Sequence, residues 1–370
     1  MYEHDFYKVI VIGAGQAGLS VGYYLSKAGI PFLILDANER VGDSWRKRWD
    51  SLRLFTPSKF DRLAGLPFPA SPNYFPTKDE MGDYLETYAA HFKIPVRTGV
   101  KVTGLTKEGD IFCLNSTAGS FLAENVVIAM SDFQVSRIPK FASELKKDIV
   151  QLHSLEYRNS SQLQDGDVLI VGAGNSGAEI SLEVARNNHK VYLSGRDTGH
   201  IPFNIEGTLS KLILARVVLR VLFHRIFTTS TPVGRKLRPK LISAGGPLIR
   251  INPDDFTKAG IIRVPRVTGV SDGLPVLENN QKLNVKNVIW CTGFNPSFSW
   301  IDLPVFKNKE LMQTRGIVEK MPGLYFTGLH FLYSFSSTMV HGAARDAAYI
   351  VKNIREKRIG VKPEEVRKAV

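Results

Sequence analysis

The chain has only two cysteines among its 370 residues, Cys113 and Cys291, and they lie far apart in the sequence. Neither belongs to a C-x-x-C pair, which excludes a dithiol redox centre made from neighbouring residues and a cysteine-rich metal site. We therefore expect no bound metal. Disulfide reductases of the C-x-x-C type are disfavoured for the same reason.

A targeting segment and a membrane span are also missing. The chain reaches its first apolar strand by about Val9 after an acidic start, which leaves neither a basic segment nor room for a signal peptide. The most apolar helical stretch, 209–227, carries too many charges to cross a bilayer. These absences predict a cytoplasmic protein.

Acidic residues are absent from 207–250, where nine lysines and arginines supply nine of the thirteen net positive charges. Within this stretch Arg216, Arg220 and His224 recur at every fourth position, as on one face of a helix. We favour a basic helix and loop that cover an anion-binding cleft. The alternative is peripheral contact with a membrane surface. No nucleic-acid reader motif accompanies the charge, so we expect no nucleic-acid partner.

The first of two glycine-rich turns, GAGQAG at 13–18, follows the strand signal KVIVI and precedes a helical segment that ends at Gly29. In such a strand-turn-helix unit Gly13 permits the tight turn, and Gly15 lets backbone N–H groups approach a pyrophosphate. Gly18 lets the helix pack on the strand. The next strand ends at Asp36, 18 residues past Gly18, where a carboxylate accepts the hydroxyls of an adenosine ribose. This unit predicts an FAD or NAD site.

The second turn, GAGNSG at 172–177, repeats the layout but lacks the acidic residue. Ser194 and Arg196 stand in its place, and both can bind a 2′-phosphate that a carboxylate would repel. The second unit therefore predicts an NADP site. The alternatives are that one turn only joins a strand to a helix, and that Arg196 is an ordinary surface arginine.

The spacing after each turn predicts an internal repeat. Ser131 lies 118 residues beyond Gly13, and Gly293 lies 121 residues beyond Gly172, each after a strongly apolar strand. We predict an α/β fold with two Rossmann-like three-layer domains, the second inserted into the first. The expected boundaries are 1–160 and 295–370 for the FAD domain, and 161–294 for the NADP domain with a basic insertion at 200–250. Hinges are expected near 154–167 and 292–296.

Longer motifs carry a resemblance to a known family. These are GDSWRKRWDSLRLFTPSKF, the pair His153 and Tyr157 before the second turn, CTGF, and GLYFTGLHFLYSFSSTMVHGAARDAAYI near the C-terminus. Together they resemble the flavin-containing monooxygenase superfamily, in its short bacterial CzcO-like branch related to plant YUCCA enzymes. The resemblance implies that FAD binds the first domain and NADPH the second. It also implies that reduced FAD forms a C4a-hydroperoxide with O2 and transfers one oxygen atom to a small organic substrate.

The resemblance and the two units together indicate a set of cofactor-binding residues. Arg345 and Asp346 are expected to close over the flavin. The FAD residues are Gly13, Gly15, Gln16, Ala17, Gly18, Asp36, Ala37, Trp45, Arg46 and Gly328, and those of the NADP side are Gly172, Gly174, Asn175, Ser176, Gly177, Ser194, Arg196, Thr292 and Gly293.

Few catalytic side chains are expected, because the cofactor performs the difficult chemistry. Arg53, Thr56 and Lys59 either hydrogen-bond the flavin ring or the nicotinamide, or are ordinary loop residues. His153 either shapes the approach between the domains or relays a proton. The aromatic residues Phe331, Tyr333 and Phe335 either wall a substrate pocket or pack within the fold.

Two other functions stay open. Lys147 and Ile149 stand where the family has Phe and Gly, Ser131 ends a strand that usually ends A-T-G, and an Asn beside the flavin has no counterpart. These departures favour an NADPH dehydrogenase that passes electrons to a quinone, a metal or a protein. A redox sensor, or an accessory partner of a membrane protein, would use the basic stretch to dock. The oligomeric state stays open.

Overall fold

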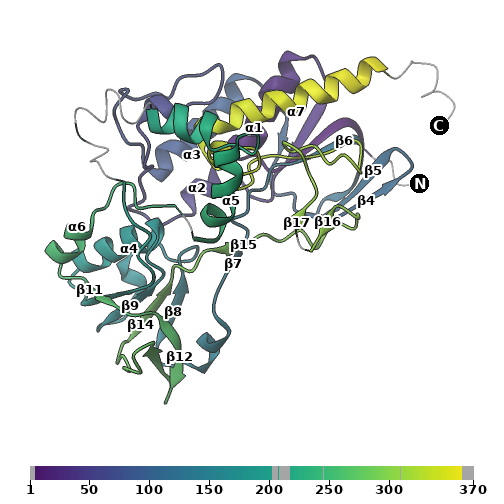
Figure 1. Ribbon diagram of the computed structural model, residues 1–370. Coiled ribbons are helices and arrows are strands. Elements are labelled where there is room, and N and C mark those ends of the chain that lie inside the picture. The colour runs from purple at the N-terminus through teal and green to yellow at the C-terminus, as the bar shows by residue number, and fades with distance from the viewer. Residues whose placement is uncertain (1–4, 202–206, 208–216, 245, 309, 361–370) are drawn as a thin grey trace.

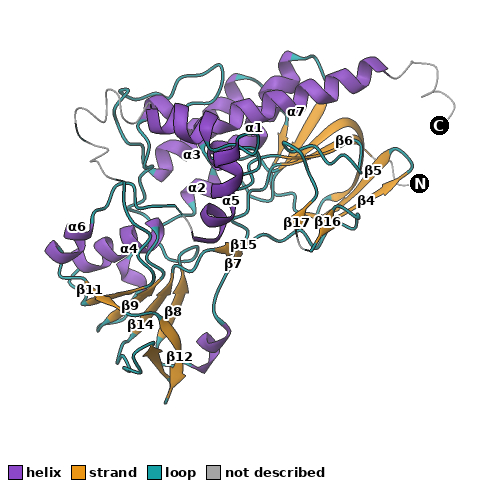
Figure 2. Ribbon diagram, viewed as in Figure 1, coloured by secondary structure: helices purple, strands orange, loops and turns teal. Residues whose placement is uncertain are grey.

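The computed structural model describes residues 5–201, 207, 217–244, 246–308 and 310–360, which form two layered units, each built on its own sheet (Figures 1 and 2). The first sheet has the strand order β3-β2-β1-β6-β5-β4, and β18 pairs with the end of β6 that β5 leaves free. Its strands are β1 (Asp5–Ile12), β2 (Phe32–Leu35), β3 (Val96–Arg97), β4 (Val102–Glu108), β5 (Ile111–Ser116), β6 (Gly119–Ile128) and β18 (Leu324–Phe326).

The second sheet is entirely parallel, in the order β11-β10-β9-β14-β8. Its central strand carries the run VLIV, whose four residues are all buried, as expected for a strand covered on both faces. Its strands are β8 (Val150–His153), β9 (Val168–Val171), β10 (Val191–Ser194), β11 (Ile262–Val264) and β14 (Asn287–Trp290).

The order of the strands along the chain confirms the predicted α/β class with one Rossmann-like unit inserted into another. Strands β1 to β6 and the later β18 belong to the first sheet, and all the strands of the second sheet lie between them. Strand β18 pairs in parallel with 126–128 of β6, so the C-terminal part of the chain completes the first unit.

The place where the chain crosses between the units differs from our expectation. Strand β8 pairs with β14, so the second unit already contains 150–153, before the expected boundary at 161. The crossing is a two-stranded antiparallel ribbon of β7 (Val135–Ser136) and β15 (Phe294–Asn295), so only the hinge expected at 292–296 coincides with it. The sequence signal was weak because each of these strands has only two residues.

Each sheet is flanked by helices, and short helices and hairpins fill the connections (Figure 2). The helices are α1 (Gln16–Lys27), α2 (Asp43–Arg46), η1 (Ser58–Phe60), α3 (Lys78–His91), η2 (Lys140–Glu144), η3 (Ser160–Gln162), α4 (Asn175–Arg186), η5 (Val217–Ile226), α5 (Pro232–Ala244), α6 (Pro253–Lys258), η6 (Phe335–Thr338) and α7 (Val340–Gly360). The remaining strands are β12 (Val267–Ser271), β13 (Leu274–Leu277), β16 (Phe306–Lys307) and β17 (Glu310–Leu311).

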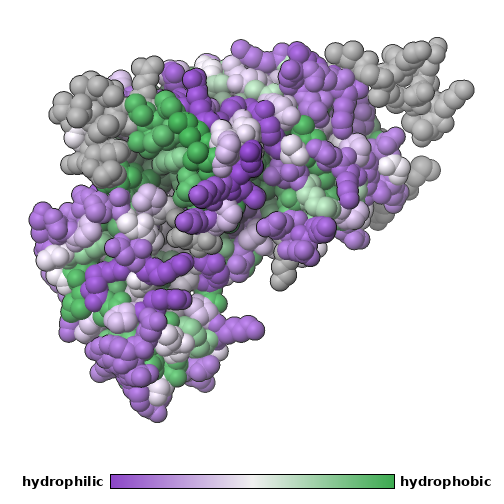
Figure 3. All heavy atoms as spheres, viewed as in Figure 1, coloured by the Kyte–Doolittle hydropathy of each residue, from purple (hydrophilic) through white to green (hydrophobic). Residues whose placement is uncertain are grey.

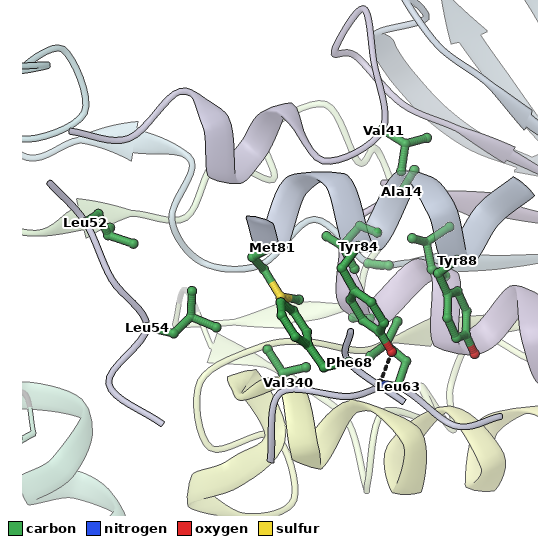
Figure 4. Packing of buried hydrophobic residues seen from close by; sticks show 14 of the residues in the cluster. Ala14, Val41, Leu52, Leu54, Leu63, Phe68, Met81, Tyr84, Tyr88 and Val340 are labelled. Carbon is green, nitrogen blue, oxygen red and sulfur yellow. Dashed lines mark hydrogen bonds between the residues drawn. The ribbon is translucent and has the colours of Figure 1, made fainter. Parts of the chain in front are cut away.

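Helix α3 anchors the long loop before it. Thr77 and Glu80 form a capping box, in which the Thr77 hydroxyl accepts from Glu80 N at 3.2 Å and a Glu80 oxygen accepts from Thr77 N at 2.8 Å. The buried ring of Tyr84 packs beside Met81, and its hydroxyl accepts a hydrogen bond from Leu63 N at 2.7 Å (Figure 4). The loop that precedes α3 is thereby held at a fixed distance from it.

The basic stretch leaves the second unit and packs on the first. It departs at His200 and returns at Leu248, whose backbones form a bridge, and the Asn175 side chain binds the returning segment at Pro247 O and Ile249 N. We call the part of the chain between these points, 201–247, the excursion. Its helices η5 and α5 lie against the C-terminal part of the first unit (Figure 1). Of the predicted basic residues in this stretch, Lys211 and Arg216 lie outside the described residues.

Both helices of this excursion leave apolar side chains exposed, and Figure 3 shows apolar atoms gathered over η5. The exposed residues are Val217 and Val221 on η5, and Val233 and Ile242 on α5. No helix of the described part of the chain is both long and apolar enough to cross a membrane.

Arg345 of α7 connects the excursion to the C-terminal segment. Its guanidinium donates to the His224 carbonyl and to Ser334 Oγ, the latter at 2.6 Å, and it lies 4.7 Å from the centre of the Tyr333 ring. The bond to the His224 carbonyl joins η5 to the first unit, and the contacts with Ser334 and Tyr333 hold the guanidinium in place to make it.

We therefore expect Arg345→Met to loosen 217–231 without unfolding the protein. Trypsin should then cleave after Arg220 and Arg225 at least about fivefold faster than in the wild type, as measured by mass spectrometry of timed digests, because cleavage follows the population of the opened segment. The matched control is Lys352→Met, on an exposed position of the same helix whose side chain pairs with Glu356. Equal cleavage rates in all three proteins would show that Arg345 does not hold the segment.

Candidate functional site

One continuous cavity of about 2170 Å³ joins both glycine turns. Its walls include Gly13 and Gly15 of the first unit, Gly172 and Gly174 of the second, and residues of the excursion such as Phe223 and Arg238. A pocket for one small ligand measures roughly 300–1,000 Å³. This cavity is more than twice as large, so it has room for two extended ligands in contact with each other.

The first turn has the tight backbone that a dinucleotide site requires. Gly13 has a φ of +105°, and a Cβ on Gly18 would lie 1.8 Å from Gly13 O, so a side chain is excluded at both positions. A Cβ on Gly15 would meet nothing within 4 Å. The open side of Gly15 therefore lies toward the cavity that it lines, where a phosphate can approach the backbone at the start of α1.

Asp36 lies at the end of β2 and lines the cavity. Its Oδ2 accepts a hydrogen bond from Ala14 N at 2.5 Å, and its Oδ1 accepts from Asn38 N at 2.7 Å. These two backbone N–H groups thus fix the orientation of the carboxylate beside the glycine turn. Oδ1 also accepts from Asn38 Nδ2 at 2.9 Å, so the acceptor site that these bonds leave for a ribose hydroxyl is the second lone pair of Oδ2.

The second turn repeats this geometry closely. Gly172 has a φ of +111°, and a Cβ on Gly177 would lie 1.8 Å from Gly172 O, whereas a Cβ on Gly174 would meet nothing within 4 Å. Ser176 lines the cavity too, but the Asn175 amide, which also lines it, is already bonded to the excursion at Pro247 O, 3.1 Å away.

The two residues expected at the 2′-phosphate differ in their surroundings. Ser194 is fully buried, and its hydroxyl donates to Pro265 O at 2.8 Å and accepts from Val267 N at 3.1 Å. These bonds stabilise the fold and occupy the hydroxyl that we expected to bind the 2′-phosphate. Arg196 is exposed on the cavity wall, and Arg266 lines the same wall. The sequence position of Ser194 could not reveal that its hydroxyl is used within the fold, because both partners are more than 70 residues away.

The structure brings most of the other expected cofactor residues to the cavity. Trp45 donates from Nε1 to Gln16 Oε1 at 3.4 Å, and both residues line the wall. Arg46 does not line the cavity, because it binds Asp83 and Glu86 at 2.7 Å each. The expected residues that also line the cavity are Ala17, Ala37, Thr292, Gly293 and Gly328.

The candidate catalytic residues separate into two groups. Arg53 and Thr56 line the cavity, and Arg53 donates to Phe75 O at 3.0 Å. Lys59 and His153 do not line it. Lys59 donates to Asn73 at 2.9 Å, and fully buried His153 binds Gly293 O with Nε2 at 3.0 Å and Leu155 N with Nδ1 at 3.1 Å. With both nitrogens bonded to backbone, His153 holds the end of the hinge rather than contacting a ligand.

The C-terminal segment reaches the cavity through only one of its predicted aromatics. Phe335 lines the wall, whereas Phe331 is buried elsewhere and Tyr333 lies between Arg315 and Arg345. Arg345 and Asp346 do not line the cavity; their side chains pair with each other at 3.0 Å. The alternation of aromatics is not a strand, because Ser334 caps the short helix η6 instead.

Several charged residues of the cavity escaped the sequence analysis. Asp132 follows the carboxyl end of β6, and Glu179 lies one turn into α4, where burial raises its pKa to about 7. Burial and the nearby Arg158 lower the pKa of Arg48, which lies 5.5 Å from the centre of the Phe294 ring. A helical spacing of four from Asn175 could have identified Glu179. Asp132 and Arg48 could not be identified from a sequence pattern, because the only indications were that Asp132 follows a strand and that Arg48 lies within a basic motif.

These residues fit two dinucleotides. Two open glycine turns at helix starts supply backbone donors, and arginines from both units and from the excursion supply cations for phosphates. The buried Nε of Arg238 has no hydrogen-bond partner among the described residues, as expected of a donor that a ligand would complete. The cavity arginines include Arg48, Arg53, Arg137, Arg196, Arg238 and Arg266.

Comparison with known proteins agrees with this architecture. Residues 10–220 match the model of the family described as pyridine nucleotide-disulphide oxidoreductase. An uncharacterized CzcO-like oxidoreductase of Geobacillus kaustophilus is 39% identical, over 94% of this chain and 97% of its own. A probable indole-3-pyruvate monooxygenase, YUCCA1 of Arabidopsis thaliana, is 28% identical over 79% and 77% of the two chains.

A solved structure has the same architecture. The flavin-containing monooxygenase of Stenotrophomonas maltophilia superposes with a TM-score of 0.75, at 25% identity, over 95% of this chain and 99% of its own.

The glycine geometry makes a paired prediction. Gly177→Ala should lower the free energy of unfolding by roughly 3 kcal/mol or more, because its methyl group would overlap Gly172 O. Gly174→Ala should unfold like the wild type, within about 0.5 kcal/mol, because its methyl group meets no atom. It should nevertheless bind NADP⁺ at least about tenfold more weakly, since the methyl group takes the space of the pyrophosphate. Urea denaturation and NADP⁺ titration measure the two effects. If Gly174→Ala bound NADP⁺ as tightly as the wild type, the assignment of the pyrophosphate to this turn would be wrong.

Proposed function

Because the chain belongs to the pyridine nucleotide-disulphide oxidoreductase family, in the CzcO- and YUCCA-like branch of the flavin monooxygenases, we propose that it uses NADPH and O2 to oxygenate a small organic substrate. It is an FAD- and NADP-dependent oxidoreductase of α/β fold. The observation that carries the proposal is the single cavity that joins the two glycine turns. Two cofactors bound at these turns can meet there, as hydride transfer requires.

We assign the first turn, with Asp36, to FAD and the second turn, with Arg196, to NADPH. Asp36 presents an acceptor for a ribose hydroxyl and would repel a 2′-phosphate. After β10, Gly195 occupies the position that Asp36 has after β2, and Arg196 follows it on the cavity wall. The two sites therefore differ in the ribose that they accept.

Bound FAD would supply the redox chemistry, including the reaction with O2. The chain's own residues would position the rings and exclude water. Phe55, Phe223, Leu241 and Phe335 give the cavity an apolar wall, and Phe223 and Phe335 pack edge to face at 4.6 Å. Such a wall suits a small apolar substrate and limits loss of the reactive oxygen to water.

The substrate belongs to the same proposal. The YUCCA1 relative is named as a probable indole-3-pyruvate monooxygenase, an enzyme of an aromatic 2-oxo acid. In this chain an apolar wall and the cationic Arg238 line the same cavity. These features are compatible with an apolar molecule that carries a polar group.

The preference of the enzyme for NADPH over NADH tests whether Arg196 binds the 2′-phosphate. Arg196→Ala should reduce the NADPH-to-NADH preference in kcat/KM by about tenfold to a hundredfold, because hydrogen bonds to charged groups contribute about 1.5–3 kcal/mol. The measurement is flavin reduction under anaerobic conditions with each nucleotide. Arg186→Ala, an exposed arginine in the last turn of α4, is the control and should keep the preference. An unchanged ratio in Arg196→Ala would contradict the assignment.

Oxygenation itself is tested by rapid mixing. The protein is reduced with NADPH under argon and then mixed with oxygenated buffer, while the visible absorption of the flavin is followed. A monooxygenase should reoxidise in two resolved phases, with oxidised flavin returning only in the second. A single phase of direct reoxidation would instead support the NADPH dehydrogenase, which passes electrons on without oxygenating. The wild-type protein suffices for both outcomes.

A further inference from the structure

A buried carboxyl group on the cavity wall has no role in the function proposed above. Asp61 follows η1, is 1% exposed, and lines the cavity. The Thr56 hydroxyl donates a hydrogen bond to its Oδ1. Its Oδ2 has no hydrogen-bond partner among the residues that the structure describes.

Among the described residues, the Thr56 hydroxyl is the group that stabilises a negative charge on Asp61. None of the ion pairs formed by described residues includes it. Burial raises the pKa of Asp61 well above its ordinary value, and the Thr56 hydrogen bond offsets this effect only in part. The titratable group facing it from α3 is the Tyr84 phenol, whose own pKa is raised to about 12 by burial. On the side of η5, Arg220 lies over the ring of neighbouring Phe60 at 5.9 Å.

A protonated carboxyl group is a hydrogen-bond donor. Oδ1 already accepts from Thr56, so the proton belongs on Oδ2, the oxygen that lacks a partner. A buried donor without an acceptor is destabilising, and a bound ligand with an acceptor would remove this penalty. The unpartnered atom thus indicates a ligand group rather than a contact within the fold.

The surrounding backbone holds Asp61 in place. Tyr84 OH donates to Leu66 O at 2.9 Å and accepts from Leu63 N at 2.7 Å, as Figure 4 shows for the second bond. Tyr88 OH donates to Ala64 O at 2.7 Å. Two buried tyrosines of α3 therefore fix the segment that begins at Asp61. A preorganised donor of this kind binds a ligand without an ordering cost.

Apolar groups complete this end of the cavity. Phe60 and Leu219 form a small buried cluster against which Phe223 packs. Phe223 in turn contacts Phe335, and both line the cavity with Asp61. A hydrogen bond made here is shielded from water and therefore discriminates strongly between ligands.

We propose that Asp61 is a ligand-binding residue of the cavity, present as the neutral carboxylic acid, and that its Oδ2–H donates a hydrogen bond to a carbonyl-type oxygen of the molecule held there. The inference rests on the proposed function in taking the cavity as the site of FAD and substrate. The carbonyl-type oxygen belongs either to the flavin ring or to an organic substrate, and the experiment separates these two sources.

The test compares Asp61→Asn with Asp61→Leu. Asn keeps an acceptor for Thr56 and a donor at the second position, whereas Leu has the same branched arrangement of four side-chain heavy atoms and no donor. Two dissociation constants are measured without NADPH: that of FAD for the apoprotein, by fluorescence quenching, and that of acetophenone for the FAD-loaded protein, from the flavin difference spectrum. Acetophenone is the probe because it joins one carbonyl oxygen to an apolar ring.

Asp61→Asn should keep both constants within about threefold of the wild type. Asp61→Leu should weaken one of them at least about tenfold: the FAD constant if the acceptor is the flavin, or the acetophenone constant if it is the substrate. Asp254→Leu, at an exposed position in the first turn of α6, is the control and should change neither. If Asp61→Leu does not fold by circular dichroism, Asp61→Ala takes its place.

Two results would overturn the proposal. In one, both constants of the donor-free variant equal those of the wild type, which includes the case in which acetophenone does not bind and FAD affinity is unchanged. In the other, Asp61→Asn loses as much affinity as Asp61→Leu, which would mean that a neutral donor is not what the ligand requires. Since binding is measured on oxidised protein without turnover, either result is distinct from a failure of oxygenation in rapid mixing.

Discussion

The close approach of a helix to a tight turn, made twice, is the contact on which the rest of the molecule depends. Gly18 and Gly177 each lie so near the first glycine of their turn that a Cβ would be 1.8 Å from its carbonyl oxygen. This contact brings the starts of α1 and α4 to the ends of β1 and β9, with their N–H groups directed to one cavity. Larger residues would separate helix from strand and remove both the packing and the anion site.

The excursion and the C-terminal segment then close the cavity from outside the two sheets. The excursion is anchored to the second unit through Asn175 and to the first through Arg345, so it contacts both units that must act together. Its basic residues serve partly inside the protein, as the position of Arg238 on the cavity wall shows. Part of the positive charge of 207–250 therefore lies at the cavity that we assign to anionic cofactors, while the exposed valines of η5 lie on the outer face of the excursion.

Prediction from sequence agreed with the structure where the position of a residue depends on local backbone geometry. Gly13, Gly15, Gly172, Gly174, Asp36 and Arg196 all follow from residues within one strand-turn-helix unit, and all six line the cavity. It was less informative where a side chain meets a partner distant in sequence. Ser194 is bonded to 265–267, Arg46 to α3 and Arg345 to η5, so three residues expected at ligands are used within the fold. The short ribbon of β7 and β15 was also too brief to leave a pattern.

The sequence by itself determined the α/β class and the insertion of one dinucleotide unit into another, and it predicted a different ribose at each of the two turns. These properties rest on hydrophobic period, glycine spacing and one charge difference, which act over a few neighbouring residues. Only the tertiary structure decided that both turns open into one cavity, that the basic stretch packs on the first unit, and that Asp61 is buried without a partner for one oxygen. Burial and the pairing of distant polar groups depend on the whole packed chain, because no local pattern specifies which surfaces will meet.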